Sequence, residues 1–259
     1  AGLQVVKKDA QQIRLGWLNR FGRTAIFVKN DIKLILRNKR SKMTIWISLM
    51  FLFYGLLFFT DSSGGLYDNP VWKIFAGIFV SGGFLFTFGQ YVPSWDSAYY
   101  PLMMSQNIVY REYLNAKWSM ITIATVFSTL LATFYLLFGW DVYAAILTGA
   151  IYNIGINGYL VLLSGAYIKT PIDLTSTKKP FGDKQAFNAK TLLLTLPKLF
   201  LPMILYFVGS LFGGEWVGYM TVAFTGILGY FLKNKVFDLI ETLYKTEKYK
   251  TLKAYKQNT

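Results

Sequence analysis

The stretch TIWISLMFLFYGLLFFT, residues 44–60, holds 17 residues and no charged side chain. At about 1.5 Å of helix rise per residue, it nearly crosses a hydrocarbon core of about 30 Å. Five further stretches of similar length and hydropathy follow, at 71–90, 119–139, 142–168, 192–212 and 216–232. The sequence therefore predicts an all-α, polytopic transmembrane bundle with six spans.

Composition supports a membrane protein and disfavours several other classes. Hydrophobic residues make up 54% of the chain and aromatic residues 18%, more than soluble domains carry. The net charge of +14 would suggest nucleic acid in a soluble protein, but these charges flank apolar stretches, where Lys and Arg set orientation. We expect the lipid bilayer as a partner and no nucleic acid. The chain lacks Cys and His, so disulfides and thiolate metal sites are excluded.

The basic residues fall on alternate sides of the stretches. Of the 27 Lys and Arg, 25 lie before the first stretch, after the second, after the fourth or after the sixth. The opposite loops carry Asp61, Asp68, Asp141 and Glu215, with Lys73 alone. Because positive loops stay inside, both termini should be cytosolic, in a bacterial inner membrane. The chain starts with Ala, so we expect a processed product, a trimmed chain or a piece of a longer polypeptide.

Four parts follow from this pattern. Residues 1–22 form a cytosolic segment, 23–43 a basic amphipathic helix along the interface, 44–232 the transmembrane domain, and 233–259 a cytosolic helix and tail. The alternative for 23–43 is a topology anchor with no further role.

The cytosolic loop 93–118, PSWDSAYYPLMMSQNIVYREYLNAKW, is too apolar for a solvated connector. Its apolar side chains are therefore expected to pack against another part of the chain or against a partner. We expect a short helix over 95–104 that presents Tyr99, Leu102 and Met103, and a second helix from 108 into the third span.

With these elements, the chain resembles the permease subunit of a type-2 ABC exporter over residues 23–232. Asp96 stands for the acidic residue of the coupling loop, 102–104 for its apolar turn, 107–108 for the following turn, and 111–117 for the re-entry. The chain departs from the family at two positions, with Asn107 for Pro and Asp96 for Glu. The resemblance implies an elbow helix at 23–43 and a coupling helix that docks on an ATPase through Trp95, Asp96, Tyr99, Leu102, Met103, Arg111 and Glu112.

The chain has no G-x-x-x-x-G-K-[ST] sequence to hold phosphates. The resemblance therefore implies that ATP and Mg²⁺ bind a separate ATPase subunit, that this chain binds no cofactor and is no enzyme, and that a second membrane half completes the transporter. That half is a second copy or another six-span unit. The alternative is a non-transporting scaffold or assembly subunit. A membrane-embedded enzyme is disfavoured because His, Cys and paired intramembrane carboxylates are lacking.

Polar residues inside the spans are the remaining candidates for a translocation path. Lys198 is the one clear charge there, and we expect its ammonium to reach back to the interface rather than bind substrate. The Thr residues at helical spacing favour helix packing, whereas two Asn carboxamides bond across helices or line the path. The candidates are Asn153, Asn157, Thr125, Thr129, Thr225 and Lys198.

Overall fold

A computed structural model describes residues 16–59, 69–106, 108–174 and 189–256. Most of these residues are helical, and none of them forms a strand. Five helical segments are long and apolar enough to cross a membrane: Lys39–Phe59, Pro70–Tyr91, Tyr110–Phe138, Trp140–Tyr167 and Leu193–Gly213. The protein is therefore an all-α integral membrane protein, as predicted.

The sixth predicted span is shorter than the other five. It forms α10 (Glu215–Phe231), whose 17 residues rise about 25 Å, less than the about 30 Å of a bilayer core. The structure thus supports five membrane-length helices in its described part, and the sixth span stays a prediction.

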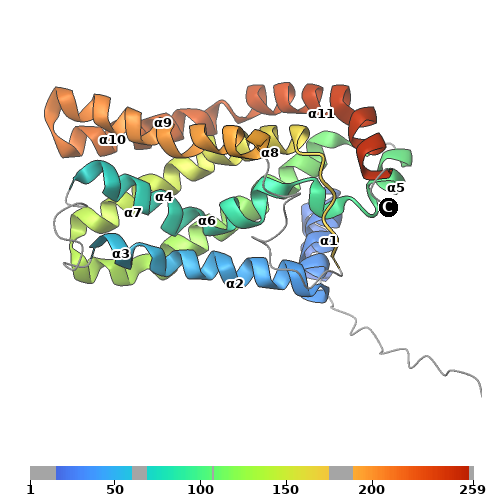
Figure 1. Ribbon diagram of the computed structural model, residues 1–259, viewed down its shortest axis with the longest axis horizontal. Coiled ribbons are helices and arrows are strands. Elements are labelled where there is room, and N and C mark those ends of the chain that lie inside the picture. Colours follow the sequence, from blue (N-terminus) through green and yellow to red (C-terminus); the bar gives the residue numbers. More distant parts are fainter. Residues whose placement is uncertain (1–15, 60–68, 107, 175–188, 257–259) are drawn as a thin grey trace, which may run out of the picture.

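The long helices run side by side along the molecule (Figure 1). They are α2 (Lys39–Tyr54) with α3 (Leu56–Phe59), α4 (Pro70–Thr87), α6 (Tyr110–Leu131) with η5 (Ala132–Phe138), α7 (Trp140–Tyr152), η6 (Asn153–Asn157), α8 (Gly158–Tyr167), α9 (Ala189–Gly213) and α10. The second span is central. In its most apolar 18 residues 72% are buried, compared with 17% in the first span. Large apolar side chains on the outer helices are exposed, including Trp46, Ile123 and Phe207, which suits contact with lipid.

Glycines let some helices approach closely. A Cβ on Gly155 would lie 1.8 Å from the Gly226 carbonyl oxygen on α10, and one on Gly149 would lie 2.7 Å from the Gly77 carbonyl carbon on α4. The Thr hydroxyls bond their own helices: Thr129 donates to the Thr125 carbonyl and Thr225 to that of Thr221. The close approaches at Gly149 and Gly155 are contacts between helices, whereas the role of the Thr residues in packing stays a prediction.

The two ends of the bundle differ in charge. One end, here called the basic end, carries α1 (Thr24–Arg37), α5 (Tyr100–Ser105) and the last turns of α11 (Lys233–Lys256). At the other end, Lys73 on α4 pairs with Asp141 on α7 at 2.5 Å. Lys73, the one basic residue assigned to the outer side, therefore pairs with an acidic residue assigned to the same side.

The basic end also shows where two predicted boundaries were wrong. Figure 1 shows α1 set crosswise to α2. The break is Asn38, whose backbone is extended and whose side chain donates to the Leu34 carbonyl, so residues 39–43 belong to α2. The short helix expected over 95–104 begins only at Tyr100, because Ser94–Asp96 forms a separate 3₁₀ turn, η4.

Candidate functional site

Three buried charged side chains meet at the basic end, each from a different segment. The Lys117 ammonium on α6 lies 2.5 Å from Asp31 Oδ1 on α1 and 2.8 Å from Asp96 Oδ2 in η4. The side chains of Lys117, Asp31 and Asp96 are 3%, 1% and 0% exposed. We call this group the ion cluster. One ammonium thus links the crosswise helix, the 93–118 segment and the third membrane-length helix.

The two carboxyl groups of the ion cluster are bonded unequally. Asp96 also accepts from the Tyr99 hydroxyl at 2.5 Å and from the Tyr113 hydroxyl at 2.7 Å. Asp31 Oδ2 is buried and meets no donor among the described residues. Burial raises the pKa of Asp31 to about 7, against the attraction of Lys117. Burial therefore favours the protonated form of Asp31, and the protonation state of this carboxyl sets the net charge of the cluster.

Trp95 anchors the turn that carries Asp96. Its ring stacks on Phe88 with centroids 4.9 Å apart, and its Nε1 donates to the Phe88 carbonyl at 3.0 Å. Trp95 is 3% exposed, so this residue and Asp96 both lie inside the chain. The resemblance to an ABC permease assigned both residues to a surface that docks on a partner, and in this structure that assignment is wrong, because both side chains are buried.

Helix α5 presents two different faces. Its inner face packs against the chain, with Tyr100 edge-on to Tyr255 of α11 and the Met104 sulfur accepting from the Tyr110 hydroxyl. On its outer face Leu102 is 61% exposed, whereas Met103 is partly buried and packs against the apolar cluster that holds Tyr100 and Met104. Of the residues predicted to dock on a partner, Leu102 is the one that α5 leaves open to it, while Tyr99 is partly buried and bonded to Asp96.

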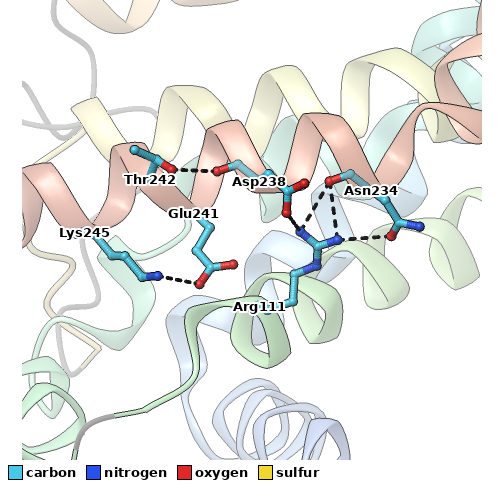
Figure 2. Close-up of polar contacts among 6 residues, drawn as sticks. All are labelled: Arg111, Asn234, Asp238, Glu241, Thr242 and Lys245. Atoms are coloured by element: carbon cyan, nitrogen blue, oxygen red, sulfur yellow. Dashed lines mark hydrogen bonds and ion pairs between the residues drawn. The ribbon is translucent and has the colours of Figure 1, made fainter.

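Arg111 binds α11 instead of facing solvent. Its guanidinium donates to the Asp238 carboxylate at 2.7 Å and to the carbonyl and side-chain oxygens of Asn234 (Figure 2). It also lies 5.3 Å from the Phe237 ring centroid, a cation–π distance. Its neighbour Glu112 is partly exposed. Arg111 thus fastens the start of α6 to α11, a role that the sequence did not predict.

A second buried polar group lies within the membrane-length helices. Asn153 donates to the Ile78 carbonyl and to Ser81 Oγ on α4, both at 2.9 Å. Asn157 donates to Asn153 Oδ1 at 2.8 Å and to the Lys198 carbonyl on α9 at 3.1 Å. Both Asn side chains are fully buried, in the π-helical segment η6. Of the two roles left open by the sequence, bonding across helices is the one that these contacts describe.

The side chain of Lys198 also turns inward. Its ammonium donates to Ser164 Oγ on α8 at 2.9 Å, and the residue is 1% exposed. The side chain extends toward the basic end, since Ser164 lies seven positions further along that helical run than Asn157, which contacts the Lys198 carbonyl. The ammonium stays buried there and does not reach solvent in this structure. Lys198, Pro202 and Tyr206 form one buried stripe of α9, so the lysine lies on the face that packs into the bundle.

The Thr candidates lie on two other helices. Thr125 and Thr129 are buried on α6, and Thr225 is partly buried on α10. The Thr125 hydroxyl finds no partner among the described residues, although its carbonyl accepts from Thr129. Asn107, expected at the turn before α6, lies outside the described residues.

Comparison with known proteins gives the family. The model of a family of unknown function, DUF5687, matches residues 1–258. The chain belongs to the DUF5687 family. No curated protein and no solved structure matches it. What this DUF5687 protein does must therefore be argued from its own residues.

The sequence analysis of this DUF5687 protein missed one member of the ion cluster. Asp31 lies within the segment 23–43, whose pattern is dominated by Lys and Arg. It is the only acidic residue between Asp9 and Asp61. A single acid on the apolar side of a basic amphipathic helix is a signal for a buried pair, because a lone carboxylate is costly to bury.

Proposed function

We propose that this protein is the membrane permease subunit of an ATP-driven ABC exporter in a bacterial inner membrane. In this proposal α1 is the elbow helix, α5 is the coupling helix, and α10 completes six spans with both termini in the cytosol. A separate ATPase subunit binds ATP and Mg²⁺ and docks on α5. A second membrane half, either a second copy or another six-span unit, completes the transporter.

The ion cluster is the observation that carries this proposal. A push on α5 reaches η4 through the adjoining backbone, and Asp96 in η4 holds the Lys117 ammonium on α6. The same ammonium holds Asp31 on α1. Removing one partner of a buried ion pair costs about 3–5 kcal/mol, so these three segments move together rather than separate. Movement of a small outer helix is thereby passed to a long helix and to the crosswise helix, as a coupling device requires.

The exposed face of α5 gives the test of ATPase docking. Leu102→Glu places a charge where the proposal buries an apolar side chain, so the amount of co-purifying ATPase should fall at least about tenfold, the equivalent of about 1.4 kcal/mol. The measurement is ATP hydrolysis recovered with the tagged, full-length protein from its native membranes. Because Leu102 is 61% exposed, the variant should insert and fold normally.

The matched control is Leu239→Glu, since Leu239 on α11 is also 61% exposed. It should keep the co-purifying activity. Equal activity in both variants would remove α5 as the docking site. A parent protein that brings down no ATPase would favour the scaffold role instead.

Topology is predicted separately. The chain has no native Cys, so single cysteines report on one position each. Glu215→Cys and Tyr249→Cys replace exposed residues on the two sides of α10. A membrane-impermeant maleimide should label position 215 in intact cells and position 249 only in inverted vesicles. Labelling of both from one side would show that α10 does not cross the membrane.

A further inference from the structure

A cavity of about 290 Å³ lies between α2, α4 and α9, close to the basic end. Its walls include Ile47 and Phe51 on α2, Phe79 on α4, and Thr195 and Leu199 on α9. All five are partly exposed, including Phe79 on the most buried helix of the bundle. No residue of the ion cluster lines this cavity, and neither do Asn153 and Asn157.

The cavity has access to the surface that faces lipid. Next to its wall residues, Trp46 and Met50 on α2 are 70% and 71% exposed, and Phe200 on α9 is 50% exposed. These apolar side chains lie on helices that are long enough to cross a membrane. Since the wall residues of the cavity on α2 and α9 are themselves partly exposed, we infer that the cavity opens toward the bilayer.

The two ends of the cavity differ chemically. Arg40, Thr44, Gln90 and Tyr91 line it near the start of α2, at the basic end. Arg40 is 7% exposed and its guanidinium also donates to the Asp173 carbonyl at 3.2 Å. A guanidinium held in this way is pre-organised to bind phosphate oxygens.

The other end of the cavity is aromatic. Phe79 stacks on Phe51 and on Phe86, with ring centroids 5.6 and 5.1 Å apart. Phe51 comes 11 positions after Arg40, about 16 Å further along a helix. The cavity is therefore cationic and hydrogen-bonding near the interface and apolar deeper in the bilayer.

We propose that this cavity binds an anionic phospholipid from the leaflet at the basic end. The phosphate lies at Arg40, with Gln90 and Tyr91 as further polar neighbours, and the upper part of one acyl chain lies along the three Phe rings; the Thr44 hydroxyl already donates to the Arg40 carbonyl. A volume of about 290 Å³ is at the lower end for a small-molecule site, so it holds one chain and the rest of the lipid stays in the bilayer. The proposal does not rest on a transport function.

The test measures binding of phosphatidylglycerol and phosphatidylethanolamine to the purified full-length protein by native mass spectrometry and by thermal shift. The parent should prefer phosphatidylglycerol at least about fivefold. Arg40→Gln should abolish that preference. Thr195→Phe keeps the arginine and fills the cavity from its partly exposed wall, so it should weaken phosphatidylglycerol binding about tenfold while the protein remains folded.

The control is Lys42→Gln, which removes the same charge from an exposed position two residues after Arg40. Its affinity should stay within about twofold of the parent. The proposal is overturned if both lipids bind equally to the parent, if Lys42→Gln loses as much as Arg40→Gln, or if Thr195→Phe binds normally. An equal shift with inorganic phosphate alone would identify an anion site without a chain, which also overturns it.

Discussion

Lys117→Met should be the most damaging single change in the basic end, lowering the free energy of unfolding by about 3–5 kcal/mol. The methionine fills a similar space, but Asp31 and Asp96, 1% and 0% exposed, lose the ammonium that both contact. Two buried carboxyl groups then face each other without a counter-charge. Loss of folded protein on heating, followed by Trp fluorescence of the detergent-solubilised chain, measures the effect.

The pH dependence of this variant has a definite sign. Burial already raises the pKa of Asp31 from 3.8 to about 7 with Lys117 present. A carboxyl whose pKa is raised on folding stabilises the fold at low pH and loses that contribution as the pH rises through the folded pKa. The loss of unfolding free energy in Lys117→Met should therefore be largest at pH 7 to 8 and should become smaller toward pH 5.

Two further variants separate this effect from a general loss of charge. Lys245→Met removes a lysine that is 62% exposed and pairs with Glu241 on the surface (Figure 2), so it should change stability by less than about 1 kcal/mol. Asp31→Asn removes the titrating group and should flatten the pH dependence between about 4 and 7. If Lys117→Met is no worse than Lys245→Met, the ion cluster does not hold these segments together.

Much of the helical framework could be predicted from hydropathy because it depends on local composition. Each apolar stretch of about 17 to 27 residues, with at most one charged side chain, needs its backbone bonded internally in the bilayer, so a helix follows directly. The apolar content of 93–118 likewise indicated burial, and the structure places Trp95, Tyr100 and Met104 inside.

What could not be predicted depends on contacts between distant residues. Asp31 and Lys117 are 86 positions apart, and nothing local to either residue identifies the other. The depth of Lys198 in its span permitted its side chain to reach the interface. Whether that side chain faces lipid or the bundle depends on the position of Lys198 around the helix axis. That position follows from the packing of α9. Because α9 has apolar residues on all sides, its sequence pattern does not show which face is buried.

Gly155→Ala should cost about 3 kcal/mol, the upper part of the range for overpacking. The added Cβ would lie 1.8 Å from the Gly226 carbonyl oxygen and 2.6 Å from its carbonyl carbon, and backbone atoms cannot turn aside as a side chain can. Helix α10 must then move away from η6, although Gly→Ala by itself favours a helix by about 0.5–1 kcal/mol. The measurement is the thermal midpoint of the solubilised protein together with proteolysis of the 214–232 region.

Gly158→Ala is the matched control, since Gly158 lies one turn further along the same helical run. There the new Cβ would meet its nearest atoms, the Asn153 carbonyl oxygen and Trp118 Cδ1, at 3.3 Å, which a small shift accommodates. This variant should be as stable as the parent or slightly more stable. The higher helix propensity of Ala offsets the small cost of the closer contacts. Equal behaviour of the two variants would mean that α10 does not pack closely on η6, and then α10 would lose one support as the sixth span, since its 17 residues alone do not establish one.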